Sequence, residues 1–479
     1  MTDRTYNTDL QLFLDGAWTS AEGRDAADVV DPATGATLAQ VPLASADDLD
    51  AALEAADRAF PKWRATDVEA RGAILRKAAS LMRERTDHIA TLLTREQGKP
   101  IAEARSEVAG AAQMFDYYAE EAKRAYGRVL VRPTGQRSIV IAQPVGPVAS
   151  FTPWNFPIYL MAKKLAAALA AGCTVIAKPP EETPGSTSEV IRALADAGLP
   201  AGVAQLVFGV PDMVSRHLIG SDVIRKISFT GSVPVGKHLM KLAADGVKRT
   251  TMELGGHAPV LIFADCDLEK TLDMVVPQKF RNAGQVCVSP TRFHVEESIY
   301  DAFVAGFARR TASVTIGDGM ASDTKMGPLA NGRRPDAIDA LVSDAVAKGA
   351  RAVAGGERGG RDGFFFQPTL LADVPLEADI MSNEPFGPVA VTRPFATMDE
   401  AVEQANRLPL GLAAFAFTEN GRRANLLGDA IEAGMVGINS FAISAADAPF
   451  GGVKHSGFGS EGGPEGLASY QVVKAIHQA

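Results

Sequence analysis

The sequence predicts an α/β fold in which helices cover a parallel sheet, and three observations lead to this prediction. Short apolar runs alternate with helical segments between residues 146 and 244. A second α/β stretch extends from residue 255 to about 445. A β-rich pattern at 128–143 has the form of a hairpin. Because strands joined through helices run parallel, the alternating region is expected to form a sheet with helices on both faces.

The first part of the chain is expected to mix short strands with long helices. Within Leu43–Phe60 a helical pattern begins after Ser45, a good N-cap, and has an acidic first turn. Residues 67–97 and 100–125 are expected to form long helices with polar faces.

The alternating region gives specific expectations for each element. The expected strands are Pro147–Phe151, Thr174–Ala177, Ala204–Phe208 and Ile224–Phe229. The helices between and after them are expected at Ile158–Ala171, Ser186–Ala197, Met213–Ile219 and Val235–Ala244. In the second stretch we expect helices at Ile338–Lys348 and Met398–Asn406 and a strand at Ala413–Thr418.

Two β segments are expected outside these sheets. The runs within 128–143 flank a Pro-Thr-Gly-Gln turn, and Tyr470–His477 is expected to be an isolated strand. Unpaired strand edges are templates for pairing with another chain, so contacts with a partner are expected here.

Composition excludes several classes of function. The chain has 479 residues, a net charge of −9 and no basic run, which argues against a nucleic-acid partner. The best apolar run, Leu165–Ala177, is too short to span a bilayer, and the first residues show no signal-peptide pattern. Three cysteines without CxxC spacing, and histidines without HxxxH or HExxH spacing, predict neither disulfides nor a metal site. We therefore expect a cytoplasmic protein without a membrane partner.

Three motifs carry the chemistry of the chain. They are FRNAGQVC at 280–287, MELGG at 252–256 and TPWNFP at 152–157. With these motifs the chain resembles the aldehyde dehydrogenase superfamily, most closely its succinate-semialdehyde and 2-oxoglutarate-semialdehyde branch. The resemblance covers nearly the whole chain, in order and without large insertions.

The resemblance implies that Cys287 forms a thiohemiacetal with the aldehyde and then a thioester. It assigns the oxyanion donors to the Asn155 amide and the Cys287 backbone N–H, and the base that activates water to Glu253. Glu253 could also help to deprotonate Cys287. Taken alone, these residues could instead be a buried apolar cysteine, an asparagine that holds a turn, and a glutamate at a helix end or turn.

The expected cofactor is NAD, with NADP possible. ISFTGS at 227–232 ends an expected strand just before a helix, where glycine permits close approach and the helix N-terminus favours phosphate. The resemblance places Gly231 and Ser232 at the pyrophosphate, although Ser232 could be a simple N-cap. It places Lys178 and Glu181 at the adenosine ribose, where the carboxylate would accept from the 2′-OH and repel a 2′-phosphate.

The nicotinamide half of the cofactor is expected beside the EPFGP motif at 384–388. By resemblance, Glu384 binds the nicotinamide ribose, Phe386 packs by the ring, and Trp154 lines the adenosine or ribose side. Any of these aromatic side chains, taken alone, would more often belong to the core.

Substrates of the semialdehyde branch carry a carboxylate remote from the aldehyde, so they need a cation in the substrate tunnel. Arg281 and Ser444 match positions that bind this carboxylate in the family, and Lys163 stands where the family has arginine. Lysine keeps the charge but loses the bidentate fork. Arg281 could instead form a structural ion pair, and the alternative substrate is then an uncharged aliphatic or aromatic aldehyde.

The resemblance also implies an organisation in three parts. The cofactor domain comprises 1–127 and 144–254, the catalytic domain comprises 255–445, and a bridging element comprises 128–143 and 446–479. The bridging element would pair with another subunit, which gives a homodimer or a homotetramer. The rival of another class, a binding protein that reuses this fold without turnover, is disfavoured by the complete set of catalytic motifs.

Overall fold

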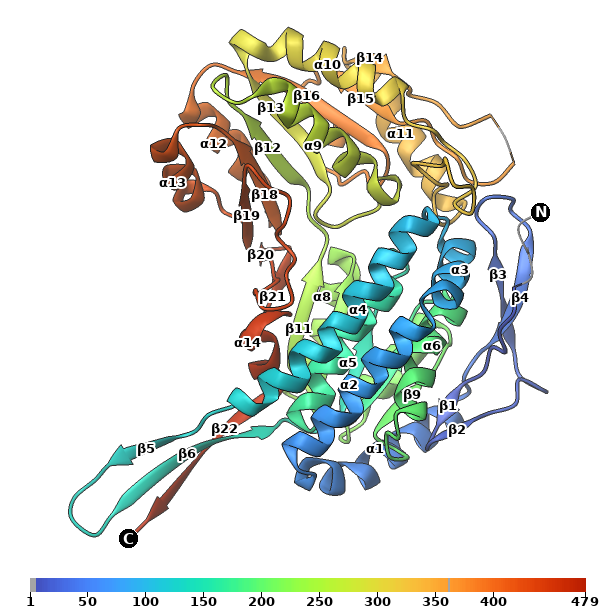
Figure 1. Ribbon diagram of the computed structural model, residues 1–479, viewed down its shortest axis with the longest axis vertical. Coiled ribbons are helices and arrows are strands. Elements are labelled where there is room, and N and C mark those ends of the chain that lie inside the picture. The colour runs from blue at the N-terminus through green and yellow to red at the C-terminus, as the bar shows by residue number, and fades with distance from the viewer. Residues whose placement is uncertain (1–5, 361) are drawn as a thin grey trace.

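The computed structural model describes residues 6–360 and 362–479, and its two main sheets lie in separate halves of the molecule (Figure 1). No signal peptide was expected in the amino-terminal segment. Residues 1–5 of this segment lie outside the described residues. In the described part of the chain, no helix combines the length and apolar content needed to cross a membrane.

The first sheet is parallel through its centre, as the alternating pattern predicts. In spatial order its strands are β2 (Ala17–Trp18), β1 (Phe13–Leu14), β9 (Ala204–Leu206), β8 (Val175–Lys178), β7 (Val148–Phe151), β10 (Lys226–Gly231), β11 (Arg249–Leu254) and β21 (Gly457–Phe458). The last of these returns from the carboxyl-terminal part of the chain and pairs antiparallel with β11.

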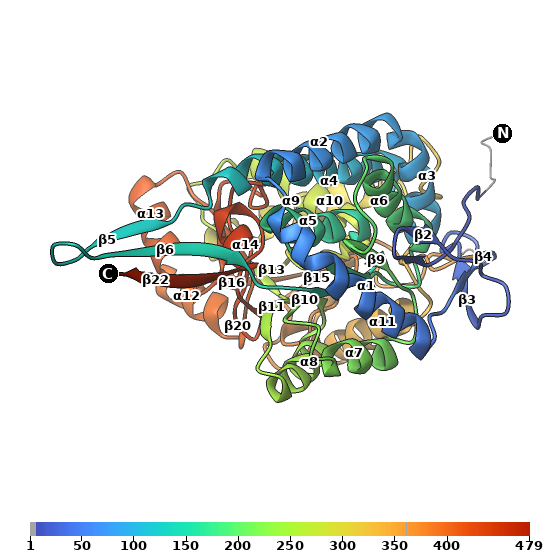
Figure 2. The same cartoon turned by 90° about the horizontal axis from the view of Figure 1, so that it is seen from below.

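Helices cover both faces of this sheet (Figure 2). One face carries α5 (Pro157–Ala171) and α6 (Pro184–Asp196), and the other carries α7 (Pro211–Gly220) and α8 (Val233–Asp245). α5 is buried at every position except Tyr159, because it is rich in alanine and is enclosed between the sheet and α4 (Ile101–Glu121). Two lysines of this helix, Lys163 and Lys164, are therefore buried as well.

The amino-terminal helices pack outside α5 and α6. The Ser45 cap is confirmed, since its side chain accepts from the Asp48 N–H at the start of α1 (Ala46–Ala65). The expectation of one helix over 67–97 is wrong in detail. The chain forms α2 (Val68–Glu84) and α3 (Thr86–Gln97), which are separated at Arg85, a residue with non-helical dihedral angles.

The second sheet follows Gly255 and Gly256, where the chain leaves β11 (Figure 1). Its strands, in spatial order, are β14 (Arg351–Ala354), β15 (Thr369–Ala372), β16 (Val389–Phe395), β13 (Pro290–Glu296), β12 (Ala258–Ile262), β18 (Ala413–Phe417) and β19 (Met435–Ile438). Its helices are α9 (Leu268–Phe280), α10 (Tyr300–Ala312), α11 (Arg333–Ala347), α12 (Met398–Asn406) and α13 (Gly421–Ala430). Each main sheet has its own hydrophobic core.

A β arm protrudes from the molecule. The predicted hairpin is confirmed as β5 (Arg128–Val131) and β6 (Arg137–Pro144). The residue pattern predicted an isolated strand at the tail, and this prediction is wrong. The tail strand β22 (Gln471–Gln478) pairs antiparallel along the whole of β6. Valines on the arm are exposed, with Val131 at 95% and Val473 at 74% of their maximal accessibility. Shorter elements are β3 (Ala26–Val30), β4 (Thr37–Pro42), β17 (Leu410–Gly411), β20 (Val453–Lys454) and α14 (Gly463–Ala468).

Candidate active site

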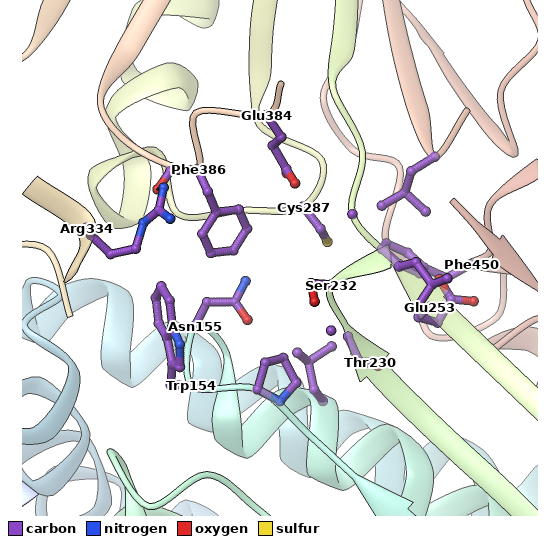
Figure 3. Close-up of a pocket in the computed structure, with 16 residues that line it drawn as sticks. Trp154, Asn155, Thr230, Ser232, Glu253, Cys287, Arg334, Glu384, Phe386 and Phe450 are labelled. Carbon is purple, nitrogen blue, oxygen red and sulfur yellow. The ribbon is translucent and has the colours of Figure 1, made fainter. Parts of the chain in front are cut away.

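Three adjoining cavities lie between the two sheets, and Cys287 borders two of them. The central cavity, of about 350 Å³, receives the side chains of Cys287, Glu253 and Asn155 (Figure 3). A cavity of about 660 Å³ adjoins it through Trp154 and Ser232. A third cavity, of about 230 Å³, adjoins it on the other side and shares Cys287 and Asn155 with the central one. Every site residue predicted from the sequence lines at least one of these three spaces.

Cys287 follows a tight turn at the end of α9. Asn282 and Ala283 adopt left-handed dihedral angles, and Gly284 lies against the carbonyl of Gly387, where a side chain would collide. This contact joins the FRNAGQVC motif to the EPFGP motif. Burial raises the pKa of the Cys287 thiol to about 12, with further contributions from the carboxyl groups of Glu384 and Glu253. Cys287 is therefore a neutral thiol in the resting protein at neutral pH.

Asn155 precedes α5 and is held by its backbone as well as its side chain. Its side-chain amide nitrogen donates to the backbone carbonyl of Gln285 at 3.0 Å. Its own carbonyl accepts from the side-chain amide of Asn282 at 2.8 Å. Asn155 is therefore tied to the same turn that carries Cys287, and its side chain is directed toward the central cavity (Figure 3).

Glu253 stands near the end of β11, where burial and the carboxyl group of Glu461 raise its pKa well above the ordinary range. The ammonium groups of Lys163 and Lys164 oppose this rise. Within the described residues, neither carboxyl oxygen of Glu253 has a hydrogen-bond partner. A carboxyl group left in this state is suited to binding and moving a proton, because it is not committed to a structural contact.

The 660 Å³ cavity contains the polar groups that a dinucleotide requires. The Lys178 ammonium is 2.6 Å from a carboxylate oxygen of Glu181, and that carboxylate also accepts from the Gly209 N–H. Ser232 is the N-cap of α8, as the alternative interpretation allowed, but its hydroxyl makes no capping hydrogen bond. The hydroxyl of Thr230 beside it is buried and has no partner among the described residues. These groups fit a dinucleotide whose diphosphate lies at the N-terminus of α8.

The EPFGP motif forms the opposite wall of the central cavity (Figure 3). Phe386 has an unusual left-handed φ of 41°, and its ring packs edge-on against Trp154 at 5.5 Å between centroids. Arg334 donates to the carbonyls of Pro385 and Phe386, which stabilises this strained turn. Burial raises the pKa of Glu384 to about 8, although Arg334 opposes the shift. Sequence reasoning did not find Arg334, because it belongs to no motif and reaches the site from α11.

The third cavity holds the residues predicted to bind a substrate anion. The Lys163 ammonium lies 3.8 Å from the ring centroid of Phe450, is buried, and has no hydrogen-bond partner in the described part of the chain. Arg281 is exposed, and its guanidinium lies 5.3 Å from the ring centroid of Phe156. The Ser444 hydroxyl is 3.2 Å from the Tyr159 hydroxyl. Among the described residues, no cluster of side chains could hold a metal ion, and none was predicted.

A thiol and an unpaired carboxyl group at the edge of a Rossmann-like sheet, beside a cavity that fits a dinucleotide, define a nucleotide-dependent oxidoreductase. The chain belongs to the aldehyde dehydrogenase family, because the family model described as "Aldehyde dehydrogenase family" matches residues 18–476. The predicted family and fold are confirmed. The enzyme is an aldehyde dehydrogenase, and its family oxidises aldehydes to carboxylic acids with NAD(P)+.

Named relatives and solved structures agree with this assignment. A putative 4-(hydroxymethyl)benzenesulfonate dehydrogenase of Comamonas testosteroni is 48% identical over 98% of each chain. The NADP(+) succinate-semialdehyde dehydrogenase of Escherichia coli K12 is 42% identical over 97% of this chain and 96% of its own. A crystal structure described as an E. coli NADP-dependent enzyme matches with a TM-score of 0.96 at 41% identity, over 98% of each chain.

Proposed function

We propose that this enzyme oxidises a semialdehyde, an aldehyde with a remote carboxylate such as succinate or 2-oxoglutarate semialdehyde, to the corresponding diacid. The observation that carries the proposal is the buried Lys163 ammonium, which lines the cavity beside Cys287 without a hydrogen-bond partner. A buried charge without a partner is costly, so an anionic ligand in this cavity would offset that cost. Arg281 and Ser444 line the same cavity and add a second cation and a hydroxyl.

The chemistry begins at Cys287. Its thiolate attacks the aldehyde carbon and forms a thiohemiacetal, whose oxyanion is stabilised by the Asn155 amide and the Cys287 backbone N–H. When bound, NAD(P)+ supplies the acceptor for the hydride that leaves this carbon. Glu253 then removes a proton from the water that attacks the remaining thioester, and the acid departs. Because the thiol is neutral in the resting protein, Glu253 can also accept the Cys287 proton at the start.

The proposed cofactor preference is NAD over NADP. Lys178 and Glu181 would hold the adenosine ribose, Ser232 and Gly231 the pyrophosphate, and Glu384 the nicotinamide ribose, with Phe386 and Trp154 packed beside the cofactor. The Glu181 carboxylate supports NAD because it lines the larger cavity and would repel a 2′-phosphate. Because two of the semialdehyde relatives are named as NADP(+) enzymes, the two cofactors are compared directly.

We expect Glu181→Ser to lower the ratio of kcat/KM for NAD+ to kcat/KM for NADP+ by about tenfold or more, equivalent to about 1.4 kcal/mol. The change removes the repelling charge and the acceptor for the 2′-OH together. Initial rates of absorbance change at 340 nm with each cofactor measure the ratio. Glu54→Ser, at an exposed position of α1, is the matched control. An unchanged ratio in Glu181→Ser would show that this carboxylate does not select the cofactor.

The substrate proposal predicts a loss that is specific to anionic aldehydes. We expect Lys163→Met and Arg281→Ala each to lower kcat/KM for succinate semialdehyde by about tenfold or more, since each removes a cation from the anion's cavity. The rate with butanal, which has similar length but no charge, should change much less. The comparison with butanal is needed because the Lys163 charge also acts on the Cys287 thiol.

Arg309→Ala, which removes an exposed arginine of α10, controls for the general loss of positive charge. If the wild-type enzyme oxidises butanal as well as it oxidises the two semialdehydes, the carboxylate proposal is wrong. The rival, a dehydrogenase for uncharged aliphatic or aromatic aldehydes, would then stand.

A sulfonate-bearing aldehyde is a second candidate. The 48% identical relative is named for a benzenesulfonate. Lys163 offers one compact charge rather than the fork that pairs two carboxylate oxygens, so it suits a tetrahedral oxyanion equally well. Including 4-formylbenzenesulfonate in the substrate comparison separates the two anions.

We also propose the domain roles and the assembly implied by the resemblance. Residues 1–127 and 144–254 would bind the cofactor and 255–445 would carry the catalytic thiol, while 128–143 and 446–479 would join subunits in a homodimer or homotetramer. The exposed valines of the β arm support the last point. Three free cysteines support a reducing, cytoplasmic location.

A further inference from the structure

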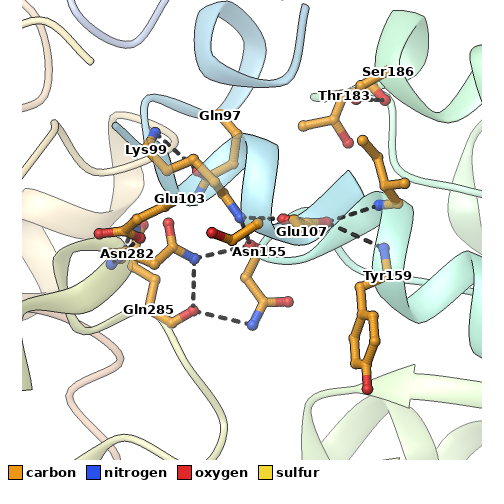
Figure 4. A network of polar contacts seen from close by, with 12 residues as sticks. Gln97, Lys99, Glu103, Glu107, Asn155, Tyr159, Thr183, Ser186, Asn282 and Gln285 are labelled. Atoms are coloured by element: carbon orange, nitrogen blue, oxygen red, sulfur yellow. Dashed lines mark hydrogen bonds and ion pairs between the residues drawn. The ribbon is translucent and has the colours of Figure 1, made fainter. Parts of the chain in front are cut away.

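A buried ion pair between Lys99 and Glu107 lies next to Asn155 (Figure 4). Lys99, which precedes α4, is 2.5 Å from the carboxylate of Glu107 within that helix, and both side chains are completely buried. Neither residue lines the central cavity, and Glu107 borders the third cavity. Burying such a pair is usually neutral or costly for stability, so the groups that it holds in place explain the pair better than a gain in stability does.

The pair holds both ends of the segment Asn155–Tyr159. The Lys99 ammonium donates to the Asn155 carbonyl at 2.7 Å. The other carboxylate oxygen of Glu107 accepts from the N–H groups of Ile158 and Tyr159, at 3.0 and 3.2 Å, and so caps the first turn of α5. α5 has no side-chain cap of its own at Phe156, the residue that precedes it. The ion pair therefore caps the start of α5, where Pro157 also favours a helix, and helps to orient the Asn155 carbonyl.

The Asn155 carbonyl also joins this pair to the turn before Cys287. It accepts a second hydrogen bond from the Asn282 side chain, and the Asn282 backbone N–H donates to Glu103 of α4 at 2.9 Å. Asn282 has left-handed dihedral angles, which asparagine tolerates better than most non-glycine residues, and these contacts hold it there. The segments that carry the oxyanion donor and the nucleophile are thus both held against α4, and the Asn155 carbonyl links them.

We propose that Lys99 and Glu107 are positioning residues for the oxyanion site, which act through the backbone of Asn155 to fix its side-chain amide relative to the Cys287 sulfur. The inference rests on the oxyanion role of Asn155 in the proposed function. An oxyanion donor acts only when it is preorganised, and displacements of about 1 Å are enough to lower rates by about 10²-fold. Lys99 and Glu107 supply that preorganisation.

The test is a double-mutant cycle in kcat, measured with NAD+ and whichever of succinate semialdehyde and butanal the wild type oxidises faster. Asn155→Ala is expected to lower kcat by about 10²–10³-fold. Lys99→Met is expected to lower kcat by about 10–100-fold in the wild-type background, with the KM for NAD+ little changed. In the Asn155→Ala background, the same change should have an effect smaller than about threefold, because the donor that it positions is gone.

Lys226→Met is the matched control, since it removes another buried lysine, at the opposite end of β10 from the active site. Its melting temperature should fall while its kcat stays close to that of the wild type. Glu107→Gln provides a second variant if Lys99→Met does not fold, because glutamine keeps an acceptor for the N–H groups of Ile158 and Tyr159. It should follow the same cycle.

Two results would overturn the inference. One is a variant of the pair with a lower melting temperature and an unchanged kcat, which would make the pair merely structural. The other is an equal loss of kcat in both Asn155 backgrounds. An unchanged kcat in Asn155→Ala itself would overturn the oxyanion role and the inference together, and so is distinguishable from a failure of the inference alone.

Discussion

Replacing Cys287 with alanine is expected to lower kcat for aldehyde oxidation by at least about 10⁴-fold, to a level near the assay background. Without the thiol no thiohemiacetal can form, and the aldehyde carbon remains trigonal. Cofactor binding should be retained, because the groups that fit the dinucleotide lie mainly in the adjoining cavity. The measurements are the absorbance change at 340 nm and, separately, the quenching of protein fluorescence by NADH.

A matched cysteine variant makes this result specific. Cys266 is a free, partly buried cysteine at the edge of the second core, outside all three cavities of the site. Cys266→Ala should keep nearly full activity and should still be inactivated by iodoacetamide, whereas Cys287→Ala has no activity to lose. Activity in Cys287→Ala above a few per cent of the wild type would contradict the thioester mechanism.

Most helices and strands could be predicted from the sequence because local residue patterns indicate them. α5, β8, α6 and β10 lie within a few residues of their predicted bounds, since apolar strands and alanine-rich helices alternate there without ambiguity. The break at Arg85 between α2 and α3 was missed, because neither proline nor glycine marks it in the sequence. The residue pattern alone gave β22 as an isolated strand, since strands more than 300 residues apart leave no local signal of their pairing, whereas the family resemblance had grouped it with the hairpin that contains β6.

The residues of the candidate site also include some that the sequence predicted and some that it did not. Cys287, Asn155 and Glu253 lie in contiguous motifs, and the structure brings all three to one cavity. Arg334 and Glu461 also carry charges that act on the site but were not predicted. Their contacts with Phe386 and Lys164 come from distant elements, and an isolated arginine or glutamate is usually a solvated surface residue. The partial burial of Arg334 and the full burial of Glu461, which the sequence alone does not reveal, distinguish them from such surface residues.

The buried lysines of α5 show why burial matters to the chemistry. Lys164 is paired with Glu461 and is 3.1 Å from the Ser228 hydroxyl, so its charge is satisfied. The ammonium of its neighbour Lys163 lies against the ring of Phe450 and has no such partner within the described chain. Two adjacent lysines thus differ in whether their charge has a partner, and composition and spacing could not predict this difference.

Glu253→Gln is expected to separate the two halves of the reaction. Hydride departure precedes thioester hydrolysis, so the variant should still form about one NADH per active site in the first turnover. The steady-state rate should then fall by about 10²–10⁴-fold, because glutamine cannot remove a proton from water. Stopped-flow measurement at 340 nm resolves the burst from the steady state, and Glu432→Gln, at an exposed position before β19, is the matched control. A burst that is itself slowed would show that Glu253 also accepts the Cys287 proton.

The pH dependence of the steady-state rate tests the same carboxyl group. Burial and Glu461 raise the pKa of Glu253, so its basic form is populated only as the pH rises through that elevated value. The wild-type rate of thioester hydrolysis should therefore continue to increase with pH above about pH 5, where an ordinary glutamate is already ionised. The residual rate of Glu253→Gln should lack this rise. A wild-type profile that is flat from pH 5 upward would mean that Glu253 is ionised throughout and that another group limits hydrolysis.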